Sequence, residues 1–128
     1  MRSVIFSTIF LISIQARAAD PYQWCQAMVD QARDFTTYPL SELIEKKRAY
    51  ARASSLDEFE VLTGKEYSKM VPLAQKHQGI TKEEAENRTL AVFKQIEIRN
   101  LSLAIKLHGM SDDQTWNMAF DQCVKAQE

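Results

Sequence analysis

The longest amphipathic pattern in the chain runs from Lys82 to His108 and spans 27 residues without Gly or Pro. Thr81 and Glu84 stand at its start as a capping box, in which two side chains satisfy the free backbone N–H groups of a helix. Gly109 follows its last turn, where a left-handed residue commonly ends a helix. The pattern therefore predicts one helix over about 82–108, about 40 Å long.

The polar and apolar side chains of this helix separate into two unequal faces. The polar side chains fall on one narrow strip, which consists of Glu84, Arg88, Gln95, Arg99, Ser102 and Lys106. The apolar side chains cover more than half of the circumference and include Leu90, Ala91, Val92, Phe93, Ile96, Ile98, Leu101, Leu103, Ala104, Ile105 and Leu107. A helix that is apolar over so much of its surface is surrounded by other elements. We therefore expect it to be the central helix of a helical domain.

Shorter helical patterns, separated by Gly, Pro and capping residues, fill the rest of the chain. Helices are expected after the cap Asp20-Pro21, over about 39–53, and then after the capping residues Ser55, Thr63 and Ser111. Pro72 should bend or restart the fourth of the six helices, because proline has no N–H to donate. The sequence has no alternating strand pattern. It predicts an all-α, single-domain bundle of about six helices around the long central helix.

The chain begins with a pattern typical of a secretory signal peptide over residues 1–18. A positive start precedes an apolar run of 11 residues, Val4 to Ile14, and Ala16-Arg17-Ala18 matches an A-x-A cleavage site. The run is too short to span a membrane. We expect cleavage near Ala18-Ala19, a helical domain over 19–128, a periplasmic or secreted location, and no stable membrane anchor.

The charge of the domain bears on its partners. Removing Arg2 and Arg17 from the 16 basic residues leaves 14 against 17 acidic residues, a net charge of −3. Nucleic acids and anionic membranes are bound by surfaces with a marked basic excess. The composition therefore argues against nucleic acid and anionic membranes as partners. We expect the partner to be another periplasmic or secreted protein.

The chain has two cysteines, Cys25 and Cys123. An even number of cysteines in an oxidising compartment is typical of a disulfide. The sequence contains no C-x-x-C motif for redox chemistry and no Cys/His cluster at zinc spacing. We therefore predict one disulfide that links the first and last helices.

Glu97 and Asn100 are polar residues within the apolar arc of the long helix. A buried carboxylate is costly unless it is paired. Buried carboxylates gather at functional sites, but ion pairs that only hold a fold perturb them in the same way, and we favour that explanation. Together with His77 they form a candidate buried polar site, and the candidate partners of Glu97 on other helices are Arg33, Arg48, Arg52 and His77.

No catalytic motif, metal site or cofactor is predicted. His77 and His108 each end a helix, where an imidazolium suits the helix dipole. Two isolated histidines do not supply the ligands that zinc needs. The sequence contains no G-x-S-x-G, no Gly-rich phosphate loop and no haem C-x-x-C-H motif.

Three functions remain open at this point. The favoured one is a protein-binding inhibitor or immunity-type module, because a rigid exported fold lacks a catalytic constellation. The second is a carrier of a small apolar ligand, held among aromatic and methionine side chains. The third is a small helical enzyme that uses Glu97 with a basic partner, although the sequence leans against an enzyme.

Overall fold

The structure is a computed structural model that describes residues 20–127, so the predicted signal peptide over 1–18 lies outside the described residues. Residues 20–127 form six α-helices and one short 3-10 helix, without a strand. The all-α prediction is confirmed. In chain order the elements are α2 (Pro21–Phe35), α3 (Leu40–Arg52), α4 (Leu56–Thr63), η1 (Tyr67–Met70), α5 (Val71–Gln78), α6 (Lys82–Lys106) and α7 (Asp113–Gln127).

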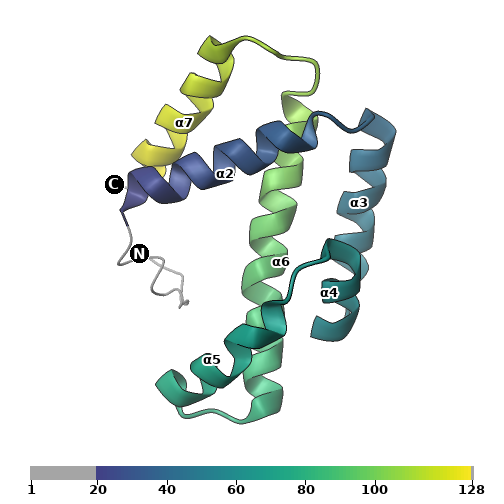
Figure 1. Cartoon of the computed structure of the whole chain (residues 1–128), viewed down its shortest axis with the longest axis vertical. Helices are drawn as coiled ribbons and strands as arrows, with labels where there is room; N and C mark the ends of the chain where they lie inside the picture. The colour runs from purple at the N-terminus through teal and green to yellow at the C-terminus, as the bar shows by residue number, and fades with distance from the viewer. Residues whose placement is uncertain (1–19, 128) are drawn as a thin grey trace.

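The long helix α6 is the centre of the molecule, as predicted. Figure 1 shows α2 crossing α6 near one end, α3 and α4 along one side, and α5 against the other end. All of these helices and η1 pack on α6, and α7 packs on α2. Helix α6 ends at Lys106, two residues before the predicted end, and Leu107 caps it.

The core forms where small and large side chains of different helices interlock along α6. Leu101 and Ala104 of α6 are fully buried in a cluster with Leu43, Phe59 and Trp116. A smaller cluster of Leu56, Val71 and Ala85 holds α5 against the first turns of α6. Burial of these side chains stabilises the bundle by about 25 cal/mol per Å² of apolar surface removed from water.

The predicted enclosure of α6 is only partial. Ile98 and Ile105, near the middle of the apolar arc, are half-buried, and Ala91 is exposed. The neighbours of α6 have between 4 and 15 residues, and they are distributed along its 25 residues instead of surrounding each turn.

The helix starts largely follow the predicted caps. Asp20 Oδ1 accepts the Tyr22 N–H at 2.9 Å. Both hydrogen bonds of the Thr81–Glu84 capping box are present. The predicted cap of α7, Ser111, is wrong by one residue. Asp112 caps the helix instead, because its Oδ2 accepts the Thr115 N–H at 2.9 Å.

The segment between α4 and α5 differs from its prediction. Thr63 does not begin a new helix: it is the last residue of α4, its Oγ1 accepts the N–H of Lys65 at 3.2 Å, and the next element follows Glu66. The chain turns at Gly64, which has φ +73°, and then forms η1 before Pro72 enters the first turn of α5. Proline is tolerated in a first turn, where its missing N–H has no helical partner. The predicted restart at Pro72 is confirmed, and the turn ahead of it brings Lys65 and Tyr67 toward α6.

The predicted disulfide is present and joins the first and last described helices. Cys25 of α2 is bonded to Cys123 of α7 across 98 residues of sequence. Both cysteines are buried. None of the helices within 20–127 is long and apolar enough to cross a membrane.

Candidate functional site

Glu97 of α6 is a buried carboxylate that joins three segments of the chain. Its side chain is 2% exposed. Gln31 of α2 donates its Nε2 to Glu97 Oε1 at 3.2 Å. Lys65 donates its Nζ to Glu97 Oε2 at 2.6 Å, and the hydroxyl of Tyr67 donates to the same oxygen. Hydrogen bonds to an ionised carboxylate are stronger than neutral ones, so these donors offset the cost of burying the charge.

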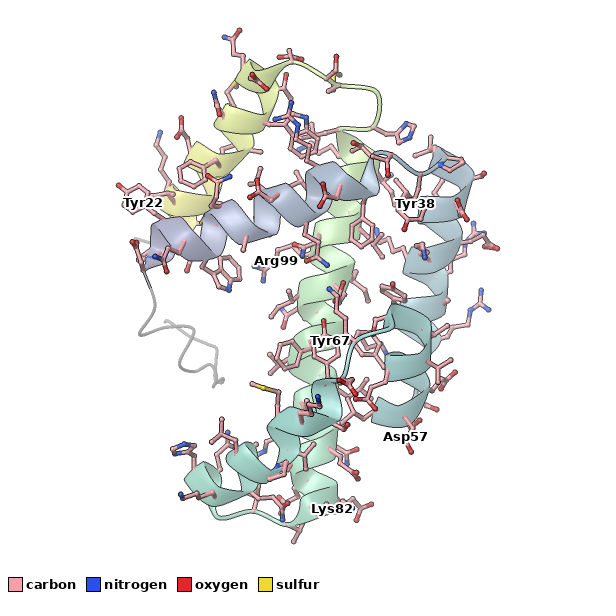
Figure 2. The ribbon with its side chains drawn as sticks, in the orientation of Figure 1. Tyr22, Tyr38, Asp57, Tyr67, Lys82 and Arg99 are labelled. Atoms are coloured by element: carbon pink, nitrogen blue, oxygen red, sulfur yellow. A yellow bond between two sulfur atoms is a disulfide. The ribbon has the colours of Figure 1, made fainter. Side chains whose placement is uncertain are left out.

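The ring of Tyr67 is held by a run of aromatic contacts. It stacks on Phe93 of α6, with 4.3 Å between the ring centroids, and on Phe59 of α4 at 5.6 Å. Phe59 in turn meets Tyr50 of α3 edge-to-face at 5.6 Å. In Figure 2, Tyr67 lies where α4 faces α6. The packing of these rings fixes the hydroxyl of Tyr67 against Glu97.

Asn100, one turn after Glu97, extends the network. Its Nδ2 donates to Gln31 Oε1. The orientation of the Gln31 amide is set by its bond to Glu97, so Asn100 must present Nδ2 to Gln31 and its own Oδ1 elsewhere. Among the described residues Asn100 Oδ1 is buried without a hydrogen-bond partner. Such an acceptor costs about 1–3 kcal/mol of stability.

The buried tyrosines beside Glu97 stay protonated at neutral pH. Burial, and then the negative charge of Glu97, raise the pKa of Tyr50 to about 12. Burial raises the pKa of Tyr67 further, helped by its hydrogen bond to Glu97. Tyr67 therefore donates its hydroxyl proton to Glu97, and Tyr50 keeps a phenol proton that it can donate. Perturbed groups that converge on one place are a physical signal of a functional site.

A cleft of about 200 Å³ opens beside Glu97, bounded by α2, α3, the end of α4 and α6. These four helices surround the region at the right of α6 in Figure 1. The cleft combines charged, hydroxyl and aromatic groups, contributed by Gln31, Asp34, Phe35, Tyr38, Lys46, Tyr50, Leu62, Thr63, Lys65 and Glu97. It can donate hydrogen bonds from ammonium and phenol groups and accept them at a carboxylate.

A second, more open hollow of about 490 Å³ lies on the outer side of α4. It is lined by Asp57, Glu60, Val61, Gly64, Lys65 and Glu66. Lys65 lines this hollow as well as the cleft, so the two depressions adjoin at this residue.

The structure brings together part of the predicted polar site. Glu97 and Asn100 are both 1% exposed and are linked through Gln31. The inclusion of His77 is wrong, because His77 is exposed on α5 and is not bonded to Glu97.

The expected basic partners of Glu97 are also wrong. Arg33 pairs instead with Asp113 at 2.8 Å, and Arg48 with Glu45 at 3.2 Å. Arg52 is exposed at the end of α3. Sequence reasoning missed Lys65, although its place after a helix-ending glycine, close to Tyr67, marked a turn that returns to the core.

The surroundings of Glu97 and the grouping of metal-binding side chains are the observations relevant to catalysis and metal binding. Glu97 Oε2 accepts two hydrogen bonds and Oε1 accepts one, which leaves a lone pair of Oε1 as the one position from which Glu97 could accept a substrate proton. In the part of the chain that the structure describes, no three His, Cys, Asp or Glu side chains are grouped to hold a metal ion. His108 instead places Nε2 3.0 Å from the backbone oxygen of Tyr38.

No family model matches this chain, and neither a curated protein nor a solved structure matches it.

Proposed function

We propose that the protein is a binding module that docks a partner protein, as inhibitors and immunity proteins do, through the outer face of α4. We call the residues that line the outer hollow, 57, 60, 61 and 64–66, together with Glu58, the α4 face. The observation that carries the proposal is Val61, an aliphatic side chain that is 83% exposed beside this hollow. An apolar centre within a polar rim is the usual anatomy of a protein interface.

The charge of the α4 face favours a basic partner. Helix α4 carries Asp57, Glu58 and Glu60 and no basic residue. The basic side chains that follow are paired, Lys65 with Glu97 at 2.6 Å and Lys69 with an acidic neighbour at 2.8 Å. Figure 2 shows Asp57 at the outer end of α4, pointing away from the body of the molecule. Opposite charge on a partner steers association and selects among partners.

The α4 face is also held in one conformation. Phe59, on the opposite side of α4, is fully buried, and Ser55 caps the helix by accepting the Glu58 N–H at 3.1 Å. Glu60 Oε2 accepts the Ser68 N–H at 2.7 Å and ties the end of α4 to η1. A surface that is ordered before binding loses little conformational entropy when it docks.

The alternative functions have less support. A carrier of an apolar ligand needs an apolar cavity, whereas four charged side chains line the cleft of about 200 Å³. An enzyme using Glu97 needs a carboxylate free to react, and Lys65 and Tyr67 already occupy one of its oxygens.

The test is capture of a partner from the periplasmic or secreted fraction of the cells that make the protein. The Val61→Arg substitution places a bulky cation at the centre of the α4 face and should reduce binding at least tenfold without changing thermal stability. Leu73→Arg is the matched control, because Leu73 is an exposed aliphatic residue on α5, away from this face.

The readout is the affinity of the captured protein for each variant, measured by surface plasmon resonance. The proposal expects wild type and Leu73→Arg to bind alike, with an association rate that falls as salt is added. A partner that binds Val61→Arg as tightly as wild type, or no partner at micromolar sensitivity, would contradict it.

A further inference from the structure

We propose that the cleft beside Glu97 binds a free α-amino acid in its zwitterionic form. This site shares Lys65 with the α4 face, but its unpaired charged residues, Asp34 and Lys46, lie outside that face.

The first argument is the balance of charge in the cleft. Its four ionic groups are two acids and two bases, but Glu97 and Lys65 neutralise each other at 2.6 Å. This leaves the carboxylate of Asp34 and the ammonium of Lys46, neither of which forms an ion pair with another described residue. Lys46 Nζ instead lies 5.2 Å from the ring centroid of Tyr38. The cleft therefore offers one unpaired charge of each sign.

A ligand with a single charge is poorly matched to this pair. Because both residues line the same cleft, an anion attracted by Lys46 is repelled by Asp34, and a cation attracted by Asp34 is repelled by Lys46. A zwitterion places its carboxylate toward Lys46 and its ammonium toward Asp34. Both interactions are then favourable.

The fixed donors of the cleft favour the carboxylate end of the same ligand. Tyr50 is 4% exposed, yet it lines the cleft, and its phenol is protonated at neutral pH. Lys65 has three N–H donors and gives one to Glu97, so two remain. Phe35 and Leu62 supply an apolar wall for a ligand side chain.

The volume of the cleft is close to that of a single amino acid. A volume of about 200 Å³ corresponds to roughly seven water molecules at about 30 Å³ each. Sites for drug-sized ligands begin at about 300 Å³. The enclosed part of the cleft therefore matches the size of one free amino acid.

Isothermal titration calorimetry of the folded protein with the standard L-amino acids tests the proposal. At least one of them should bind with a Kd between micromolar and millimolar, the range expected for so small a ligand. Its N-acetyl derivative, which lacks the ammonium, and its carboxamide, which lacks the carboxylate, should each bind at least tenfold more weakly. No binding at millimolar concentration, or equal binding of either derivative, would overturn the proposal.

Two substitutions locate the site. Asp34→Asn and Lys46→Gln should each weaken binding at least tenfold and leave thermal stability unchanged. Asp30→Asn on α2 and Lys47→Gln on α3 are matched controls, because these residues do not line the cleft, and they should bind as wild type does. Equal losses in the controls would show a general charge effect and contradict the site. Val61→Arg should keep full affinity, which separates this proposal from docking at the α4 face.

Discussion

At the scale of single residues, Glu97 connects parts of the chain that share no secondary structure. Its carboxylate receives donors from α2, from the turn after α4 and from η1. Removing a charge from water costs several kcal/mol, and only well-placed donors offset that cost. Glu97 therefore favours the arrangement in which all three segments reach α6 together, and this arrangement also shapes the cleft.

Tyr50 gives a prediction for alkaline pH. Because its pKa is raised from 10.0 to about 12 in the folded protein, the unfolded chain releases this proton first as the pH rises. The contribution of protonated Tyr50 to the free energy of unfolding is fully present below pH 10 and is lost as the pH rises toward about 12. A pKa shift of this size changes the free energy of unfolding by about 3 kcal/mol at most.

The measurement is urea unfolding at pH 8 and at pH 11.5. Wild type should lose about 2 kcal/mol more than Tyr50→Phe over this interval, because the variant has no phenol to ionise at this position. Equal losses in the two proteins would show that Tyr50 ionises alike in the folded and unfolded states.

The polar residues of α6 show what sequence can predict at this scale. The helical period alone places Glu97 and Asn100 on the apolar side, and both are buried. Their partners could not be predicted, because Gln31, Lys65 and Tyr67 are separated from Glu97 by between 30 and 66 residues of sequence. Which of several polar side chains arrives there depends on how the whole bundle packs.

At the scale of elements, local signals define the helices well. Caps and glycines act within a few residues, so the starts of α2, α4 and α6 follow from Asp20, Ser55 and Thr81. The stretch after Gly64 was less predictable. Its backbone is set by the contacts of Tyr67 and Lys65 with α6, which override its local helical pattern.

Substitution of Gly64 tests the conformation of this turn. Its φ of +73° favours glycine, and a Cβ at this position would meet no atom within 4 Å, so a substitution is penalised by backbone conformation alone. Gly64→Val should cost about 2 kcal/mol, whereas Gly64→Asn should cost under about 1, since asparagine tolerates the left-handed region. Thermal unfolding compares the two variants. Equal, small effects would contradict the left-handed turn.

At the scale of the whole molecule, the disulfide and α6 define the architecture together. Helix α7 packs on α2, and the bond between Cys25 and Cys123 joins these two helices near the ends of the described chain. The sequence predicted this pairing because the chain holds one pair of cysteines. The sequence-based prediction overestimated how completely α6 is enclosed. A hydrophobic arc indicates which face of a helix is covered, but it does not indicate how far along the helix each neighbour extends.

Removing the disulfide should therefore lower stability strongly. Closing a loop across 98 residues removes about 4–5 kcal/mol of entropy from the unfolded chain. Cys25→Ala combined with Cys123→Ala should lower the free energy of unfolding by about 3–5 kcal/mol, and reduction of wild type should give a similar loss. Chemical unfolding measures both. A loss under about 1 kcal/mol would mean that the remaining contacts already hold α7 in place.

The most direct test of the central claim, that the ion pair between buried Glu97 and half-exposed Lys65 holds the turn against α6, is a double-mutant cycle of Lys65→Met and Glu97→Gln followed by urea unfolding. Lys65→Met alone leaves the buried carboxylate with only its two uncharged donors, Gln31 and Tyr67, and should cost about 1–3 kcal/mol, more than the double variant costs. The exposed pair of Glu66 and Lys69 is the control and should couple by no more than about 0.5 kcal/mol. A coupling energy between Lys65 and Glu97 that is no larger than that of the control pair would contradict the claim.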